Sequence, residues 1–269
     1  MIWRKALAFI KRDWTIESSY KFAFVFGLIT SVLPVFSFYF IGKLVGGRGA
    51  ESLSKYGVGY FPFAMIGVAF TQYLMVALRS FANTIRRSQM AGCLEAMLST
   101  RTRPGTVIAM SSLYSFVMKT IHILLVFTIA GLFLGVEYRQ ANILTALVIV
   151  VLTILTFSSL GIFSAAVIVV LKKGDPIEWV FGSLCSLLGG ALFPISIMPP
   201  WMQMISKVLP ITYSLDAMRL AVFQGYTVPM VWKDLAILGG MAVILLPASI
   251  WSFSKAVDKG RRDGSLMHY

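Results

Sequence analysis

Long apolar runs alternate with short polar segments along most of the chain. Six of these runs approach the length of about 20 apolar residues that a helix needs to cross the hydrocarbon core of a bilayer. They cover residues 22–41, 58–78, 106–134, 143–171, 176–193 and 235–253. The pattern predicts an all-α integral membrane protein with six transmembrane helices, so both ends of the chain are expected on the same side.

A further apolar stretch, residues 187–225, is interrupted by prolines. They are Pro194, Pro199, Pro200 and Pro210. The pieces between them are too short to cross a bilayer, and irregular backbone at membrane depth is tolerated only where protein or a wet cavity surrounds it. Residues 199–207 and 212–224 are therefore expected to form two short helices in a re-entrant hairpin, with Pro194 and Pro199 ending the fifth span. An ordinary external loop packed on the bilayer is the alternative.

The composition agrees with a membrane protein. Of the 269 residues, 58% are hydrophobic and only 13% are charged, and the mean hydropathy is +0.81. The net charge of +13 raises the question of nucleic acid, but the basic residues are scattered in short segments between apolar runs, where membrane topology and lipid head groups explain them. Membrane lipid is the expected partner, and nucleic acid is not. Cys93 and Cys185 give no disulfide framework and no metal cluster.

The distribution of Lys and Arg predicts the orientation. A cytoplasmic amino terminus places roughly twice as many of these residues in the inner segments as in the outer ones, as the positive-inside rule requires. Both termini are therefore expected in the cytoplasm, with the chain crossing the plasma (cytoplasmic or inner) membrane several times.

Two cytoplasmic segments show helical periodicity. In residues 1–21, apolar residues such as Trp3 and Trp14 alternate with basic ones, which predicts an amphipathic helix at the membrane interface; a helical extension of the first span is the alternative. In the loop 79–104, apolar residues at helical spacing predict a second amphipathic helix. Its apolar face has no core of its own, and the spacing leaves open whether it rests on lipid or on a partner protein.

Lys119 and His122 are the ionisable residues inside the third run. A charged side chain at the bilayer centre is costly and marks a functional site by default, which makes both residues candidates for a substrate pathway. The alternatives are that Lys119 reaches the inner interface by snorkelling and that His122 forms an interhelical hydrogen bond. Near the fifth run, Asp175 and Glu178 fit a helix-capping box with Pro176 at the first helical position, so a structural role is expected for them.

Two segments resemble a known family. GCLEAMLSTRTRPGTVI (92–108) resembles the coupling helix of type 2 ATP-binding-cassette (ABC) exporter permeases, with Cys93 where the family usually has Thr and Arg101 where Pro is common. FPISIMPPWMQMISKVLPITYSLDAMRLAV (193–222) resembles the same family's segment between the fifth and sixth spans. A Phe-Pro, a Pro-Trp, a Pro-Ile-Thr-Tyr and an Asp-x-x-Arg occur there in the family's order.

The resemblance implies a homodimer of six-helix subunits bound to two copies of a cytoplasmic ABC ATPase subunit. No G-x-x-x-x-G-K-[ST] phosphate loop occurs in the sequence. The chain is thus expected to be no enzyme by itself and to bind no cofactor, with ATP and Mg on the partner. The residues that the resemblance assigns to the ATPase-coupling helix are Gly92, Leu94, Glu95, Met97 and Leu98. Those that it assigns to a re-entrant gate at the outer mouth are Phe193, Pro194, Pro199, Trp201, Pro210, Tyr213, Asp216 and Arg219.

The chain is expected to form one transmembrane domain over residues 1–269. Its segments are the interfacial helix (1–21), spans one and two (22–78), the coupling loop (79–104), spans three to five (105–193), the re-entrant helices (194–232), and span six with the cytoplasmic tail (233–269). The expected function is ATP-driven export of an amphipathic substrate, namely a drug, a lipid or a lipid-linked saccharide.

Two other classes fit less well. An ion-coupled secondary transporter also has broken helices, but it normally carries more acidic residues inside the membrane, whereas every acidic residue here maps to a loop or a span end. A membrane enzyme would need a cluster of catalytic side chains, and the two histidines, His122 and His268, are far apart in sequence.

Overall fold

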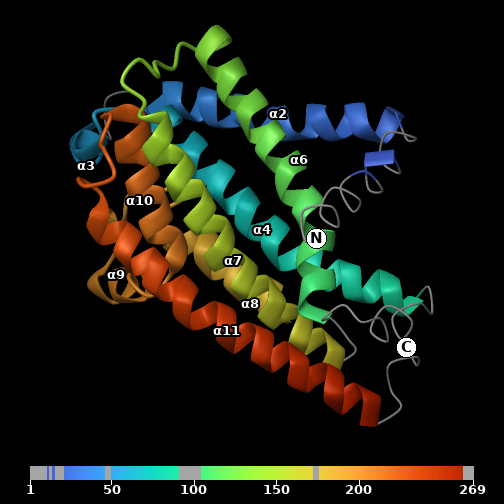
Figure 1. Cartoon of the computed structure of the whole chain (residues 1–269). Coiled ribbons are helices and arrows are strands. Elements are labelled where there is room, and N and C mark those ends of the chain that lie inside the picture. Colours follow the sequence, from blue (N-terminus) through green and yellow to red (C-terminus); the bar gives the residue numbers. More distant parts are fainter. Residues whose placement is uncertain are drawn as a thin grey trace.

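The computed structural model describes residues 11, 14–15, 21–45, 50–90, 104–171 and 176–262. These residues form helices joined by turns and short loops, with no strand among them, which confirms the all-helical prediction (Figure 1). The first ten residues and the loop 91–103 lie outside the described residues, so the interfacial and coupling helices stay predictions.

Each predicted apolar run overlaps a helix, but the helix of the second run continues past the predicted end at Leu78 to Met90, into the predicted coupling loop 79–104. The helices are α2 (Lys21–Val45), α3 (Ala50–Leu53), η2 (Ser54–Tyr56), α4 (Tyr60–Met90), α6 (Pro104–Phe133), α7 (Ile143–Leu171), α8 (Pro176–Leu188), η3 (Ile195–Ile197), α9 (Pro200–Ser206), α10 (Pro210–Phe223) and α11 (Trp232–Arg262). Several of them begin with a proline, which suits the first helical position because it lacks the N–H that would have no partner there.

Within the described residues, four helical segments are long and apolar enough to cross a membrane. They are Tyr60–Phe81, Ser112–Phe133, Ile143–Leu171 and Trp232–Lys259. The shorter apolar helical segment Val32–Val45 overlaps the predicted first span, and Ile177–Leu188 lies within the predicted fifth span. The chain is therefore a multi-pass membrane protein with at least these four candidate spans.

The fifth predicted span differs from its prediction at its carboxyl end. The sequence pattern placed this end at Phe193, with Pro194 as the helix breaker, but α8 ends at Leu188 after 13 residues. Gly189 and Gly190 follow, and Gly190 has φ 76°, a left-handed conformation that glycine adopts without steric cost. At a rise of 1.5 Å per residue, α8 is about 20 Å long, which is shorter than the hydrocarbon core.

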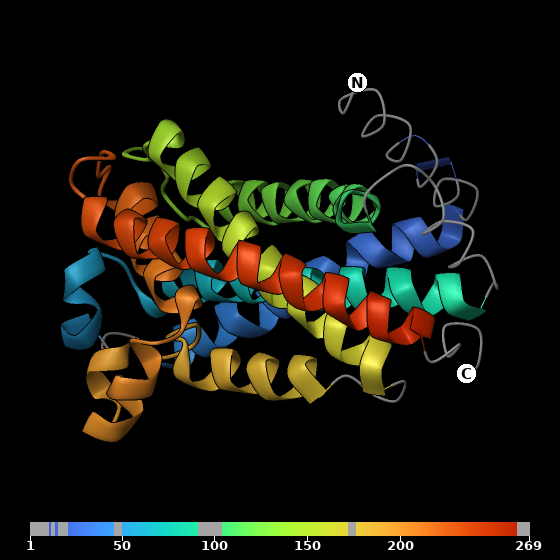
Figure 2. The same cartoon turned by 60° about the horizontal axis from the view of Figure 1, so that its bottom comes forward.

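Helix α4 lies at the centre of the bundle, in contact with α2, α6, α7, α8 and α10 (Figures 1 and 2). Its core side chains include the fully buried Phe63, Phe70 and Leu74. Helix α7 approaches α4 closely at Gly161, where a Cβ atom would lie 2.1 Å from the carbonyl oxygen of Ala77. This packing makes α4 the element against which the other helices are positioned.

The bundle has two different ends (Figures 1 and 2). The start of α2 and the carboxyl ends of α4, α7 and α11 lie at one of them. The short elements α3, α9 and α10 gather at the other, which we call the α9/α10 end. The short helices of the proline-rich stretch thus share one end of the bundle.

Candidate functional site

The short helices at the α9/α10 end are tied to the end of α8. They cover Pro200–Ser206 and Pro210–Phe223, close to the predicted 199–207 and 212–224. The Ser206 hydroxyl donates to the Leu188 carbonyl at 2.6 Å, and the Thr212 hydroxyl donates to the Ser206 carbonyl at 2.7 Å. These bonds hold the turn between α9 and α10 against the point where α8 stops.

Asp216 on α10 joins this hairpin to η2. Its carboxylate accepts from Lys55 Nζ at 2.6 Å and from the Tyr56 hydroxyl at 2.6 Å. Burial, and then the Asp216 charge, raise the pKa of the Tyr56 phenol above its ordinary value of 10.0, so this group stays a protonated donor at neutral pH. Gln224 Nε2 adds a hydrogen bond to the Lys55 carbonyl at 2.6 Å.

Arg219, one helical turn after Asp216, is buried to 2% exposure. Its Nη1 donates to the Gly190 carbonyl at 3.0 Å, and its Nη2 donates to the carbonyls of Ala191 at 3.0 Å and Phe63 at 3.1 Å. The guanidinium carbon also lies 3.4 Å from the centre of the Phe63 ring, a cation–π contact. Arg219 therefore links α10, α4 and the segment that follows α8 through backbone acceptors.

Gly67 on α4 makes room for that segment. A Cβ atom at this position would lie 1.8 Å from the Ala191 carbonyl oxygen, far inside van der Waals contact. The Ala191 carbonyl that Arg219 binds thus packs directly on the α4 backbone, and a side chain at position 67 would push it away.

A cavity of about 360 Å³ adjoins these contacts at the α9/α10 end. It is lined by the charged Lys55, Asp216 and Arg219, by Tyr56 and Thr212, and by backbone and side chains of η2, the Gly189–Gly190 turn and residues 194–196. Both signs of charge are present: Lys55 is paired with Asp216, and Arg219 donates to backbone carbonyls.

The other predicted gate residues surround this network without joining it. Trp201 is 58% exposed and Phe193 is half-exposed, while the Tyr213 hydroxyl donates to the Lys207 carbonyl at 2.7 Å. Pro210 is buried at the start of α10. Pro194 and Pro199 flank η3 with ψ angles of 137° and 151°, so both prolines lie in extended backbone after the end of α8.

The predicted pathway residue Lys119 lies in a second, separate cavity. Its Nζ donates to Gln72 Oε1 at 2.9 Å. The cavity measures about 490 Å³. It is lined by residues of α2, α4 and α6, namely Thr30, Gln72, Met75, Val76, Arg79, Ser80, Asn83, Ser115 and Lys119. We call this space the Lys119 cavity. Among its lining residues no side chain is acidic.

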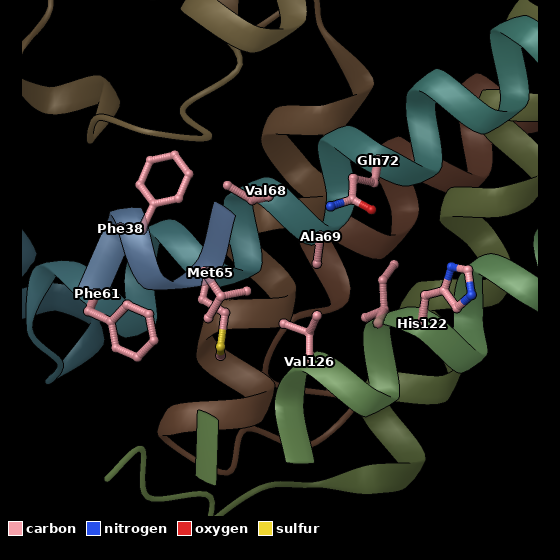
Figure 3. A pocket seen from close by; sticks show the side chains of 10 residues that line it. Phe38, Phe61, Met65, Val68, Ala69, Gln72, His122 and Val126 are labelled. Carbon is pink, nitrogen blue, oxygen red and sulfur yellow. The ribbon is translucent and has the colours of Figure 1, made fainter. Parts of the chain in front are cut away.

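His122 faces a different space (Figure 3). It lines a small apolar cavity together with Gln72 and with residues such as Met65 and Val126 from α4 and α6. Gln72 borders both cavities. The structure therefore separates Lys119, in polar surroundings, from His122, next to an apolar cavity.

Glu178 contributes to contacts between helices. It accepts from Arg79 Nε at 2.6 Å and so joins α8 to α4. Its predicted capping partner, Asp175, lies outside the described residues, as do the coupling-helix residues Gly92, Leu94, Glu95, Met97 and Leu98.

The sequence did not predict the side chains that bind the candidate residues. Lys55 and Tyr56 bind Asp216, and Gln72 binds Lys119. Gln72 carried a weak signal as a polar amide in an otherwise apolar run. Lys55 and Tyr56 carried none, because nothing local connects a loop residue to a helix that follows 161 residues later.

These features define a class of protein. Several apolar helices long enough to cross a membrane, with a broken helical hairpin at one end and polar cavities between helices, are typical of polytopic transport proteins. A family model for ABC-2 type transporters matches residues 2–223, and the chain belongs to this family. Among curated proteins, no relative matches the chain.

Membership in this family decides between the transport classes that the sequence left open. The chain is the membrane permease subunit of an ABC transporter, and it is not itself the catalytic subunit. Such a permease works with an ABC ATPase partner.

Proposed function

We propose that this permease subunit exports an amphipathic substrate, a drug, a lipid or a lipid-linked saccharide, from the cytoplasmic side outward. The observation that carries the proposal is the ABC-2 type transporter match over residues 2–223. A separate ATPase subunit supplies the energy, in keeping with the lack of a phosphate-loop motif in the sequence.

The proposed layout has six spans and cytoplasmic termini. Helix α2, with 25 residues, is about 38 Å long and exceeds the thickness of the hydrocarbon core. Helix α8 completes its crossing through the irregular segment and the α9–α10 hairpin. The basic residues near the start of α2 and the carboxyl ends of α4 and α11 support a cytoplasmic location for this side of the bundle.

The coupling loop is proposed to dock on the ATPase. Gly92, Leu94, Glu95, Met97 and Leu98 form the helix that rides in a groove of the ATPase, in a complex of two permease and two ATPase subunits. Closure of the ATPase dimer on ATP and Mg then moves the spans through this contact.

The α9–α10 hairpin is proposed as the outer gate. Three elements distant in sequence, η2, α4 and the segment after α8, are tied to α10 through Asp216 and Arg219. A shift of α10 therefore moves the walls of the adjoining cavity together, whereas an ordinary external loop would need no such ties.

Coupling is tested with Glu95→Arg and Leu98→Asp in the reconstituted complex. Each variant is expected to insert normally and to lose substrate-stimulated ATPase activity, because the charge reversal or the buried carboxylate disrupts the docking face. Glu137→Arg, a charge reversal at an exposed residue between α6 and α7, is the matched control and should keep full stimulation. Normal stimulation in both coupling variants would overturn the docking proposal.

Topology is tested by cysteine labelling in a background without Cys93 and Cys185. Ser206 lies at the tip of the hairpin but is buried, so the reporter cysteine belongs at Val208, which is 71% exposed. Val208→Cys should react with an impermeant reagent from outside only. Ser254→Cys, at an exposed site near the other end of α11, should react from the cytoplasm only. The reverse pattern would refute the proposed orientation.

A further inference from the structure

In the part of the chain that the structure describes, the cation of the Lys119 cavity has a neutral side-chain partner. Lys119 Nζ donates to the amide oxygen of Gln72 at 2.9 Å, and an ammonium group has three donors. Lys119 also belongs to the candidate span Ser112–Phe133, where an unneutralised charge is expensive. An anion in the cavity would remove that cost.

The second cation of the cavity is already neutralised. Arg79 Nε binds Glu178 of α8 at 2.6 Å, and Glu178 is not among the lining residues. The remaining polar lining consists of amides and hydroxyls such as Asn83, Ser80 and Ser115, which are able to donate hydrogen bonds to an oxyanion. The lining therefore carries one net positive charge, which is that of Lys119.

We propose that the Lys119 cavity binds the anionic head group, a phosphate or a carboxylate, of the amphipathic molecule that the permease transports. This inference rests on the proposed export function and narrows its substrate class to anionic amphiphiles. The neutral lining donors orient the head group, and Lys119 neutralises it.

The position of the cavity suits a molecule that arrives from the membrane. Its lining on α4 runs from Gln72 to Asn83, about 16 Å along the helix axis, which reaches from inside the span to beyond its end at Phe81. Its volume of about 490 Å³ accommodates a head group but not the chains of a lipid. Helices α2 and α6 both expose apolar side chains, including Ile29 and Ile121, against which chains are able to pack.

A comparison with the α9/α10 end explains why the ligand is assigned to the Lys119 cavity. There Lys55 is paired with Asp216 and Arg219 is bound to three carbonyls, so an incoming anion would have to displace protein groups. To bind an anion, Lys119 would give up only its hydrogen bond to the neutral Gln72 amide. It would form an ion pair in its place, in a medium of low dielectric constant.

The test is native mass spectrometry of the purified permease in neutral detergent, titrated with phosphatidylglycerol, with phosphatidylcholine of the same chains, and with inorganic phosphate. Wild-type protein should bind phosphatidylglycerol about tenfold more tightly than phosphatidylcholine, the change expected for one ion pair. Lys119→Met should abolish this preference, and Lys119→Arg should restore it.

Lys43→Met is the control, because Lys43 is an exposed cation near the carboxyl end of α2; it should keep the wild-type preference. Equal phosphatidylglycerol binding by wild type and Lys119→Met would overturn the proposal. So would Lys119-dependent binding of inorganic phosphate without a preference for phosphatidylglycerol, because the site would then take free anions instead of amphiphiles.

This outcome is independent of the coupling experiment. Lys119→Met should still copurify with the ATPase subunit, and Glu95→Arg should still prefer phosphatidylglycerol. Loss of the lipid preference alone would refute the head-group site and leave the exporter proposal in place.

Discussion

Two cations within the bundle, Arg219 and Lys119, have opposite relations to their surroundings. Arg219 donates to three backbone carbonyls from two other segments and lies against the Phe63 ring. Lys119 has one neutral amide partner and borders a polar cavity. In the first arrangement both terminal nitrogens of the guanidinium donate to the protein, and its buried Nε has no hydrogen-bond partner among the described residues. The second arrangement leaves donor capacity at a space large enough for a ligand.

The difference teaches how to separate a structural charge from a binding charge. A cation that donates to several buried acceptors of the fold stabilises the fold, because its removal leaves those acceptors without a donor. A cation that the fold has left partly paired costs stability, and its presence is explained by what it binds. Stability measurements on matched variants distinguish the two roles.

The largest effect is expected from Arg219→Met. Three carbonyls lose their donor at once, and each buried acceptor without a partner costs roughly 1–3 kcal/mol, so a loss of about 3 kcal/mol or more in the free energy of unfolding is expected. Thermal unfolding in detergent measures it, with Arg139→Met at an exposed loop residue as the control. Equal unfolding temperatures for the two variants would show that Arg219 does not stabilise the fold.

Gly67→Ala tests the same contacts at the Ala191 carbonyl, which accepts a hydrogen bond from Arg219. The new Cβ atom would lie 1.8 Å from the Ala191 carbonyl oxygen, so the segment after α8 must shift, at a cost of about 2 kcal/mol. Gly239→Ala is the matched helical control, because nothing lies within 4 Å of its new Cβ atom, and it should gain up to about 1 kcal/mol. A stable Gly67→Ala protein would show that this segment moves freely.

Asp216→Asn is expected to have a smaller effect. The change removes the charge that binds Lys55 but keeps an oxygen that accepts from Tyr56. Because the Lys55 side chain is 56% exposed, solvent screening limits the loss to about 1 kcal/mol. The same unfolding assay measures it against Asp258→Asn at an exposed position of α11. A loss as large as that of Arg219→Met would mean that the network acts as one unit.

The smallest effect is expected from Lys119→Met. Removing a partly paired charge relieves its desolvation cost and sacrifices one hydrogen bond, so the free energy of unfolding should stay within about 1 kcal/mol of wild type or rise slightly. The unfolding temperature of the lipid-free protein checks this expectation. A drop comparable to that of Arg219→Met would place Lys119 among the structural cations and contradict the distinction between the two sites.

Local pattern was sufficient for the elements that depend on local properties. The apolar run 143–171 coincides with α7 (Ile143–Leu171), because it is long, uncharged and bounded by polar residues on both sides. The starts of α9 and α10 lie close to their predicted positions, since proline favours the first turn of a helix. The predicted end of α8 is wrong because the Gly189–Gly190 turn, and not Pro194, ends the helix; the Gly190 carbonyl of this turn accepts from Arg219.

The contacts that make up the two sites could not be predicted from the sequence. Spacing along a chain reports which residues share a helix face, and it showed Asp216 and Arg219 one turn apart and Lys119 inside an apolar run. It does not report which residue of another helix stands opposite. Arg219 and Phe63 are 156 residues apart, and Lys119 and Gln72 are 47 apart. Their pairing depends on how α4, α6 and α10 pack, and packing is set by side-chain shapes across the whole bundle, including the close approaches at Gly67 and Gly161.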